Sequence, residues 1–398
     1  MLFEKKNNFC FVDVGSYKTV CLICRINGTR AHYLSSGIVK TRGIKRGKIN
    51  DAGELKASIL AAVFEAEQAA SVNVDEVVIS ISSTECFEKK AIVRDYLFGK
   101  QVSKGDIKKL VNKSLSELDS SKHEVIHNFS NRFCLDDITV VKNPENLFAD
   151  SIEAEVYMVY SNISHLVNVA TILAGCHLKP LEFVLDVYAS SLAVLPDGAN
   201  KSLVIDIGGD STKYGFFDDG ALSNSGTILI GGSNITKDIA AFFSTSFEEA
   251  ERLKTVYGDL LSLSDNKLVP IKQALNPKEG ASNSIKGYDL NQVILARLEE
   301  LAEIVQKKVS HLKFSTIYLT GGGAKIPGTA KLFENVVKKR VEVCDSKFSV
   351  GNSKVEKDPT YFTAIGLVKC FLFDRAASGV SLATNPLLKI LNWLKANF

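Results

Sequence analysis

The sequence predicts an α/β protein built from two duplicated lobes, and three stretches carry this prediction. Residues 203–220 form an apolar strand with one aspartate, a glycine turn and a second apolar strand, and residues 11–20 repeat this plan. Residues 317–328 run from a third apolar strand into three consecutive glycines. The two similar hairpins lie nearly half a chain apart, and 398 residues are too many for one simple core. A duplicated architecture follows.

Both glycine turns suit phosphate groups, because successive main-chain N–H groups at such a turn form a concave anion site. A single turn of this kind is most often a plain hairpin, so the pair carries the prediction. Asp13 and Asp206 stand just before the turns and suit Mg²⁺, held directly or through water. The candidate phosphate-binding residues are Gly15, Ser16, Tyr17, Lys18, Gly208, Gly209, Asp210, Ser211 and Thr212.

The glycine run after the third strand lets the main chain lie flat against a ring, which we expect to be a nucleoside. The alternative is a glycine-rich loop without a ligand. With both hairpins preceding it, the run favours nucleotide binding. The candidate adenosine-binding residues of this run are Gly321, Gly322, Gly323, Ala324 and Ile326.

Composition narrows the classes of protein further. The net charge of +3 argues against wholesale nucleic-acid binding, and the 45% share of hydrophobic residues indicates a folded globular chain. Cys21 and Cys24 form a single Cys-x-x-Cys that would point to opposite faces of a strand, so zinc is not expected. The eight cysteines are expected to be reduced core thiols of a cytoplasmic protein. No apolar run reaches the length of about 20 residues that a spanning helix needs.

The remaining segments are assigned by hydrophobic spacing and by capping residues. Helices are expected at 54–70, from Ser103 to 118, at 163–178, 183–195, 248–258 and 290–312. Strands are expected at 75–83, 123–141 and 151–160, a loop at 270–286 and a linker at 373–384.

The three glycine motifs resemble the phosphate-1, phosphate-2 and adenosine motifs of the actin, Hsp70 and sugar-kinase superfamily. Within it, the whole chain resembles the FtsA family of bacterial cell-division proteins. The string RGIKRGKIND at 42–51, the string EVIHNFSNRFCLDD at 124–137 and the KNP at 142–144 carry this resemblance. It implies actin-like, duplicated ribonuclease-H-like lobes with an FtsA-type 1C insertion and a C-terminal amphipathic helix.

The resemblance also implies domain bounds and further site residues. Subdomain 1A would be 1–83 with 161–200 and 358–375, subdomain 1C 84–160, subdomain 2A 201–228 with 313–357, and subdomain 2B 229–312. Gly231, Gly232, Glu251 and Lys254 would contact the adenosine, although Glu251 and Lys254 alone read as a surface ion pair. Arg297 and Glu300 would bind the C-terminal tail of the tubulin-like FtsZ, although alone they read as a solvated helix face.

One departure from the family pattern bears on hydrolysis. Asp210 stands where the phosphate-2 motif usually has a third glycine, and Lys213 stands where it usually has an aspartate. The extra carboxylate places negative charge near the phosphates. We expect ATP and Mg²⁺ to bind. Because of this charge, we expect at most slow ATPase activity, and no catalytic residue is assigned.

The C-terminus reads as a linker at 376–385 and an amphipathic helix at 386–398. Its apolar face, single tryptophan and lysines suit a membrane interface, whereas docking on the protein's own core is the alternative. The candidate membrane-binding residues are Leu387, Leu388, Ile390, Leu391, Trp393, Leu394, Lys395 and Phe398.

Together these features favour a structural adaptor over an enzyme. It would bind ATP, polymerise, tether FtsZ filaments to the inner face of the cytoplasmic membrane at the division septum, and recruit other division proteins through subdomain 1C. It would be a peripheral protein of the cell inner membrane that binds anionic phospholipid. The alternatives are a pilus-assembly relative of FtsA and a soluble kinase of the superfamily, which would need a general base and a substrate pocket.

Overall fold

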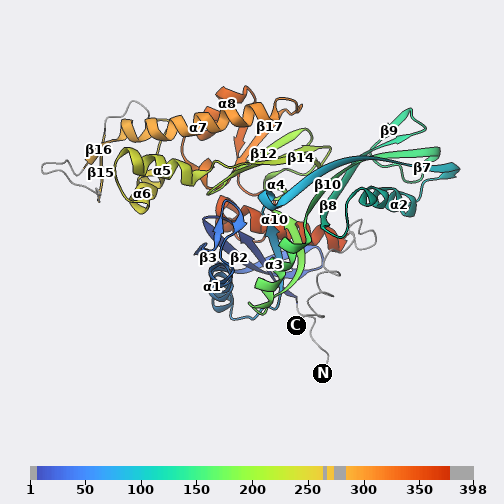
Figure 1. Cartoon of the computed structure of the whole chain (residues 1–398), viewed down its shortest axis with the longest axis horizontal. Coiled ribbons are helices and arrows are strands. Elements are labelled where there is room, and N and C mark those ends of the chain that lie inside the picture. The colour runs from blue at the N-terminus through green and yellow to red at the C-terminus, as the bar shows by residue number, and fades with distance from the viewer. Residues whose placement is uncertain (1–6, 263–266, 273–283, 377–398) are drawn as a thin grey trace. The chain divides into compact units, whose positions relative to one another are not determined.

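The computed structural model describes residues 7–262, 267–272 and 284–376, which form two compact units (Figure 1). Within these residues, the first unit spans 7–200, 215–225 and 346–376. The second unit spans 201–214 and 226–345 apart from the gaps. The chain has two five-stranded sheets, one for each unit, although residues 215–225 of the second sheet are grouped with the first unit.

The sheet of the first unit has the strand order β3-β2-β1-β6-β11. Its strands are β1 Asn8–Val14, β2 Lys18–Asn27, β3 Arg30–Lys40, β6 Glu76–Ile81 and β11 Lys179–Leu185. Strand β1 pairs antiparallel with β2 and parallel with β6. A small hairpin, β4 Ile44–Lys45 and β5 Lys48–Ile49, follows β3.

Helices cover both faces of this sheet. On one face, α1 Ala52–Ala70 and α3 Ile163–Ala174 bury apolar residues against the Cys10 and Cys21 side of β1 and β2. Asp51 caps α1 by accepting from Glu54 N at 2.9 Å, so the helix begins at Ala52, two residues before its predicted start. On the other face, Phe371 of α10 Phe362–Ala376 packs on Phe9 and Phe11.

The cysteines of β1 and β2 lie in this core. Cys10, Cys21 and Cys24 are fully buried, and the Sγ atoms of Cys10 and Cys21 are 3.4 Å apart. Burial raises the pKa of the Cys24 thiol to about 12, so it stays protonated at neutral pH. Their position, like that of Cys176 and Cys370, matches the prediction of core thiols. Cys86, Cys134 and Cys344 are only partly buried, so the prediction is wrong for these three.

The second unit's sheet has the order β14-β13-β12-β17-β18. Its strands are β12 Ser202–Ile207, β13 Thr212–Asp218, β14 Ala221–Ile228, β17 Thr316–Thr320 and β18 Arg340–Val343. If β12, β13 and β14 are matched to β1, β2 and β3, and β17 and β18 to β6 and β11, the two sheets have the same strand order. Strand β12 also pairs parallel with β17, as β1 does with β6. The predicted duplication is therefore confirmed.

The other elements of the second unit are mainly helical. They are α5 Gly232–Phe242, α6 Phe247–Tyr257, α7 Gly287–Val309, the 3-10 turn η3 Gly322–Lys325, α8 Thr329–Val337, and the short strands β15 Leu268–Pro270 and β16 Ser284–Lys286. Helices α5, α6 and α7 lie side by side (Figure 1).

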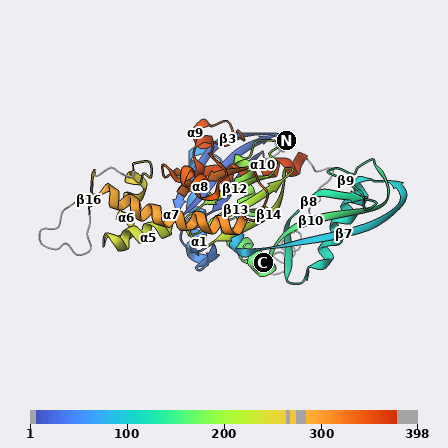
Figure 2. The ribbon, with the colours of Figure 1, turned by 90° about the horizontal axis from the view of Figure 1, so that it is seen from above.

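The first unit also carries an insertion with its own sheet, in the order β7-β10-β8-β9 (Figure 2). Its elements are β7 Cys86–Gln101, α2 Lys104–Ser114, β8 His123–Leu135, β9 Thr139–Val141 and β10 Phe148–Asn162, with 3-10 turns η1 Ser83–Glu85 and η2 Leu115–Glu117. Helix α2 packs its apolar residues into a core separate from that of the lobe. Ser103 and Asp106 form a capping box at its start, as the sequence predicts.

Five sequence-based assignments need correction. The loop predicted at 270–286 extends too far, because residues Ser284–Lys286 form β16. The strand predicted at 123–141 is two strands, because the chain turns at Asp136 and Asp137, which have φ of 52° and 59°. The helix predicted at 183–195 begins only at Asp186, since the preceding residues complete β11. Strand β7 was not predicted, and the predicted linker starts too early because α10 runs to Ala376.

Three other elements complete the first unit: α4 Asp186–Val194, α9 Ser353–Lys357 and the 3-10 turn η4 Pro359–Tyr361. Gly366 of α10 crosses Ala189 of α4 so closely that a Cβ on it would lie 1.7 Å from Ala189 O. The predicted amphipathic helix at 386–398 lies outside the described residues. Among the described helices, none is both long enough and apolar enough to span a membrane.

Candidate functional site

The two predicted phosphate turns have the same local geometry. Gly15 N donates to Lys18 O at 3.0 Å, and Gly208 N donates to Ser211 O at 3.0 Å. A Cβ built on either glycine would lie 2.9 Å from that same carbonyl oxygen. Each turn therefore closes tightly on itself and needs glycine at its first position.

Helix α5 is docked onto the second turn through main-chain hydrogen bonds. Gly232 N donates to Gly208 O at 2.9 Å and Ser233 N to Gly209 O at 2.8 Å. A Cβ on Gly231 would lie 2.4 Å from Gly209 O, so only glycine permits this approach. The structure thus brings Gly231 and Gly232 to the phosphate-2 turn, where their first role is to hold it.

The hydroxyl groups predicted to bind phosphate are not equivalent. Thr212 is fully buried, and its Oγ1 donates to Ile230 O at 2.8 Å. Ser211 is also buried. In the first copy, Tyr17 is partly exposed and its main-chain carbonyl accepts from Thr41 N at 3.0 Å. Thr212 therefore supports the turn instead of facing a ligand.

The glycine run after β17 lies against the end of β12. Gly321 has φ of 85°, and a Cβ on it would lie 2.4 Å from Asp206 Oδ1. A Cβ on Gly323 would lie 2.2 Å from Ile207 Cγ2, whereas one on Gly322 would meet nothing within 4 Å. Two of the three glycines are therefore required by contact with β12, and Gly322 is the open one. The η3 turn that begins at Gly322 also carries Ala324 and leads into Ile326, both of which are buried.

Glu251 and Lys254 form a buried ion pair on α6, with Lys254 Nζ 2.6 Å from Glu251 Oε2. Lys254 is only 8% exposed, so the alternative of a solvated surface pair is wrong. Burial lowers the pKa of Lys254, and the Glu251 carboxylate opposes that shift. Lys254 also donates to Gly232 O at 3.1 Å, which ties α6 to the start of α5.

The two predicted magnesium ligands have different surroundings. Ser80 Oγ donates to Asp13 Oδ1 at 2.8 Å and accepts from Val14 N at 3.1 Å, which fixes Asp13 at the end of β1. Asp206 is 8% exposed and pairs in register with Thr320, whose buried Oγ1 lacks a hydrogen-bond partner within the described residues. A carboxylate beside an unsatisfied hydroxyl fits a hydrated cation. Among the described residues, no cluster of three metal-ligating side chains is found, so phosphates and water would complete its shell.

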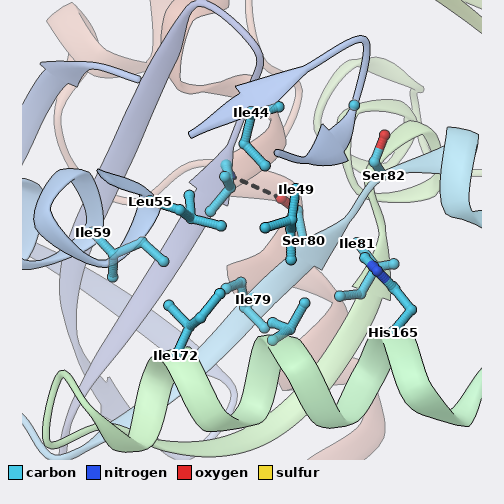
Figure 3. Close-up of a pocket in the computed structure, with 13 residues that line it drawn as sticks. Ile44, Ile49, Leu55, Ile59, Ile79, Ser80, Ile81, Ser82, His165 and Ile172 are labelled. Atoms are coloured by element: carbon cyan, nitrogen blue, oxygen red, sulfur yellow. Dashed lines mark hydrogen bonds between the residues drawn. The ribbon is translucent and has the colours of Figure 1, made fainter. Parts of the chain in front are cut away.

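A small apolar cavity lies beneath the first hairpin (Figure 3). Its volume is about 30 Å³, enough for water but not for a nucleotide. Ser80 lines it beside Ile44, Ile79 and Ile172, and the dashed line in Figure 3 marks the bond from Val14 N to Ser80 Oγ. The cavity thus belongs to the support of Asp13 and is not a ligand site.

A groove of about 590 Å³ runs along α5 and α7. Asp238, Ala241, Phe242, Val293, Ala296, Arg297 and Glu300 line it. Phe242 is 63% exposed. Arg297 Nε lies 2.6 Å from Asp238 Oδ2, and Arg297 also pairs with Glu300. The structure therefore places both predicted FtsZ-binding residues at the rim of an apolar groove.

Two family models match the chain. The model "Cell division protein FtsA" matches residues 203–366, and "SHS2 domain inserted in FTSA" matches residues 79–160. These stretches make up more than half of the chain, and the second coincides with the insertion of β7 to β10.

The chain belongs to the FtsA family.

Curated FtsA proteins are similar along almost the whole length. The cell division protein FtsA of Rhizobium meliloti is 26% identical, covering 90% of this chain and 85% of that protein. FtsA of Buchnera aphidicola subsp. Schizaphis graminum is also 26% identical and covers 97% of both. FtsA of Bacillus subtilis is 25% identical and covers 91% of this chain and 83% of its own.

Solved structures share the fold. One from the PilM-PilN type IV pilus biogenesis complex superposes with a TM-score of 0.64 at 16% identity, covering 91% of this chain and 97% of its own. MreB5 of Spiroplasma citri bound to ADP superposes with a TM-score of 0.55 at 11% identity, covering 93% and 97%. These likenesses confirm the predicted actin-like fold with its FtsA-type insertion.

Sequence reasoning missed three residues that support the site, two at the second turn and one at the first. Thr236 bonds to both Glu251 and Lys254, and Asn234 Oδ1 accepts from Gly231 N at 3.1 Å. Ser80 orients Asp13 from the neighbouring strand. Asn234 and Thr236 stand three and five residues after Gly231, so their spacing on a helix that begins at the glycine pair was the available signal. No local signal marks Ser80, because its contact depends on strand pairing.

Proposed function

We propose that this FtsA-family chain is an ATP-binding, actin-like adaptor that polymerises and tethers FtsZ filaments to the membrane during cell division. The observation that carries the proposal is the pair of identical glycine turns on two sheets of the same order. Family membership supports the cell-division role. The pilus-assembly and soluble-kinase alternatives gain no support beyond a shared fold.

In this proposal, the glycine turns hold the phosphates and the second unit holds the nucleoside. Main-chain N–H groups of a tight turn suit phosphate oxygens. Asp13 at the first turn and Asp206 at the second are each a proposed Mg²⁺ ligand, directly or through water, and the ion would neutralise phosphate charge. Ser80 keeps Asp13 oriented before the nucleotide arrives.

Hydrolysis is proposed to be slow. Asp210 adds a carboxylate at the phosphate-2 turn, and Lys213 replaces the acidic residue usual at that position in the family. A negative charge beside phosphates opposes the build-up of further charge as the bond to the γ-phosphate breaks. A turnover above about one per second, ordinary for enzymes, would contradict the proposal.

The groove of α5 and α7 is the proposed site for the C-terminal tail of FtsZ. Ala241, Val293 and Ala296 offer an apolar lining, and the exposed ring of Phe242 extends it. A short peptide with apolar anchors and an acidic residue fits such a groove, since its carboxylate can compete for Arg297. Arg297 is already paired with two carboxylates, so binding would exchange partners instead of leaving a buried charge unpaired.

The tail at 386–398 is the proposed membrane anchor. Burying each leucine, isoleucine or phenylalanine side chain contributes roughly 1.5–3 kcal/mol, but ordering a dozen residues costs roughly 1–2 kcal/mol each. One tail therefore binds weakly, and a filament that presents many tails binds far more tightly. ATP-gated self-association would then control attachment. Tail-dependent binding that stays equally tight in a variant unable to polymerise would contradict this step.

Co-sedimentation with anionic lipid vesicles tests the adaptor proposal. FtsZ, Mg-ATP and the full chain are compared with the same mixture containing a chain that ends at Ala383. We expect FtsZ to pellet only with the full chain. If the full chain pellets without FtsZ, the partner assignment fails while the anchor stands.

If neither protein pellets, the anchor fails as well. An Arg297→Ala variant of the full chain separates the two roles, because it should still pellet itself but carry less FtsZ. Lys307→Ala, on the last turn of the same helix and outside the groove lining, is the matched control.

A further inference from the structure

Three side chains and one carbonyl form a closed polar cluster where α5 meets α6. Lys254 Nζ lies 2.8 Å from Thr236 Oγ1, 2.6 Å from Glu251 Oε2 and 3.1 Å from Gly232 O. Thr236 is fully buried and Lys254 nearly so, while the Glu251 side chain retains 18% of its exposure. Glu251 is thus the member of the cluster that reaches solvent.

The donor count limits what Lys254 can do. An ammonium group has three protons and no acceptor, and three acceptors surround Lys254. Every proton of Lys254 is therefore engaged by the protein itself. A hydrogen bond from Lys254 to a nucleotide would require breaking one of these buried bonds.

Thr236 determines how the Glu251 carboxylate is presented. Its hydroxyl accepts from Lys254, so its single proton goes either to Gly232 O at 3.0 Å or to Glu251 Oε2. The contact with Glu251 is the shorter one, and a charged acceptor makes the stronger bond. Glu251 Oε2 then receives two hydrogen bonds. Within the described part of the chain, Oε1 receives none, which leaves it for a ligand donor.

We propose that Thr236 is a positioning residue of the nucleoside site, and that Lys254 acts with it to hold Glu251, which alone contacts the ligand. The ligand group is a hydroxyl or amino donor of the nucleoside, because a carboxylate oxygen only accepts. This inference rests on the proposed nucleotide function. It goes further because it assigns Lys254 to the support of Glu251 instead of to direct contact with the ligand. The same cluster fixes Gly232 O, so it also holds the helix that supports the phosphate-2 turn.

Isothermal titration with Mg-ATP on the full chain tests the proposal. Thr236→Val removes the hydroxyl at nearly constant volume, and Thr236→Ala removes it without placing a methyl group beside the ammonium. We expect both to weaken ATP binding about tenfold, the size of a lost hydrogen bond to a charged group. Thr236→Ser keeps the hydroxyl and should bind within about twofold of the wild type.

A matched control is available on α3. Thr171 Oγ1 donates to Val167 O at 2.8 Å, the same contact with the residue four positions earlier that Thr236 makes with Gly232. Thr171→Val should leave ATP affinity unchanged. Melting temperatures of all variants show whether a loss of binding is a loss of folding, and a Thr236→Ser that binds as weakly as Thr236→Val would overturn the proposal.

A double-mutant cycle provides the readout that a purely structural role would not give. Glu251→Ala should lower ATP affinity, and adding Thr236→Val should cause no further loss, because Thr236 acts through Glu251. Independent, multiplying losses would overturn the positioning role. A wild-type chain that binds no ATP would overturn the proposed nucleotide function itself, whereas normal binding by Thr236→Val would overturn this inference alone.

Discussion

The two glycine hairpins share one turn geometry but are held in place by different means. In the first copy, side-chain hydroxyls support the hairpin: Ser80 bonds to Asp13 and Val14, and Thr19 Oγ1 lies 2.8 Å from Thr41 Oγ1. In the second copy, main-chain groups of α5 bond directly to the turn, and Gly321 lies against Asp206. A duplicated motif can thus keep its turn while the groups that support it change. In the second copy, main-chain bonds from α5 are added to the side-chain bond that Thr212 makes.

The largest effect is expected from a substitution that breaks the main-chain hydrogen bonds between α5 and the second turn. Gly231→Ala would place a Cβ 2.4 Å from Gly209 O and 2.7 Å from Ser211 N, so α5 must move off the turn. We expect a loss of more than about 3 kcal/mol in the free energy of unfolding, since backbone atoms cannot yield as a flexible side chain can. Urea unfolding of the full chain measures it. A variant as stable as the wild type would show that the docking of α5 is not rigid.

The next prediction concerns acid and applies to the first unit alone. His127 Nε2 accepts from Leu185 N at 3.0 Å, and burial lowers the pKa of His127 to about 3. Between about pH 6.5 and 3 the unfolded chain binds the proton and the folded chain does not, so stability falls as pH falls. The loss should reach about 2 kcal/mol at pH 5.

His127→Gln keeps an acceptor for Leu185 N without titrating in this range. Its free energy of unfolding should therefore change less between pH 7 and pH 5 than that of the wild type. Equal pH dependence in both proteins would mean that folding does not lower the pKa of His127.

A third prediction compares one hydroxyl from each copy. Ser80→Ala removes the acceptor of Val14 N and one hydrogen bond to Asp13, which should cost about 1–2 kcal/mol. Thr320→Val removes a buried hydroxyl that has no partner within the described residues, so it should be neutral or slightly stabilising without Mg²⁺. Chemical unfolding in EDTA separates the two. Equal destabilisation by both substitutions would mean that the two copies rely on hydroxyl support alike.

The smallest expected effect is a near-zero difference between the destabilisation caused by the same glycine substitution in the two turns. Gly15→Ala and Gly208→Ala each bring a Cβ to 2.9 Å from a turn carbonyl. Their changes in the free energy of unfolding should agree within about 0.5 kcal/mol, which is the usual tolerance for independent sites. Thermal or urea unfolding of the two single variants measures this. A large difference would show that the surrounding supports, not the turns, determine the strain.

The sequence predicted the duplication and the turns because both depend on local patterns. A short apolar run, an aspartate and a glycine within ten positions are enough to indicate such a hairpin. The helix cap at Ser103 was equally local and is confirmed. The whole-chain resemblance added the insertion, which the family model for residues 79–160 confirms.

What the sequence could not predict depends on contacts between distant segments. Ser80 is an ordinary strand serine until β6 is paired with β1, which brings it to Asp13. Thr236 and Lys254 lie eighteen positions apart, and only the packing of α5 on α6 joins them. The glycines at 321 and 323 were assigned to a ligand, but the structure shows that contact with β12 already requires them.

The two ends of the insertion lie side by side where the chain leaves and re-enters the first unit. Cys86 at the start of β7 pairs with Ser161 near the end of β10, and Ser161 Oγ donates to Glu85 O at 2.7 Å. Because both ends are already side by side, removing the segment requires only a short closing turn, whose entropic cost is small. The insertion can therefore be exchanged as one piece. Grafting the equivalent insertion from another member of the FtsA family between these two ends would change the surface of the insertion while leaving the lobe's own sheet intact.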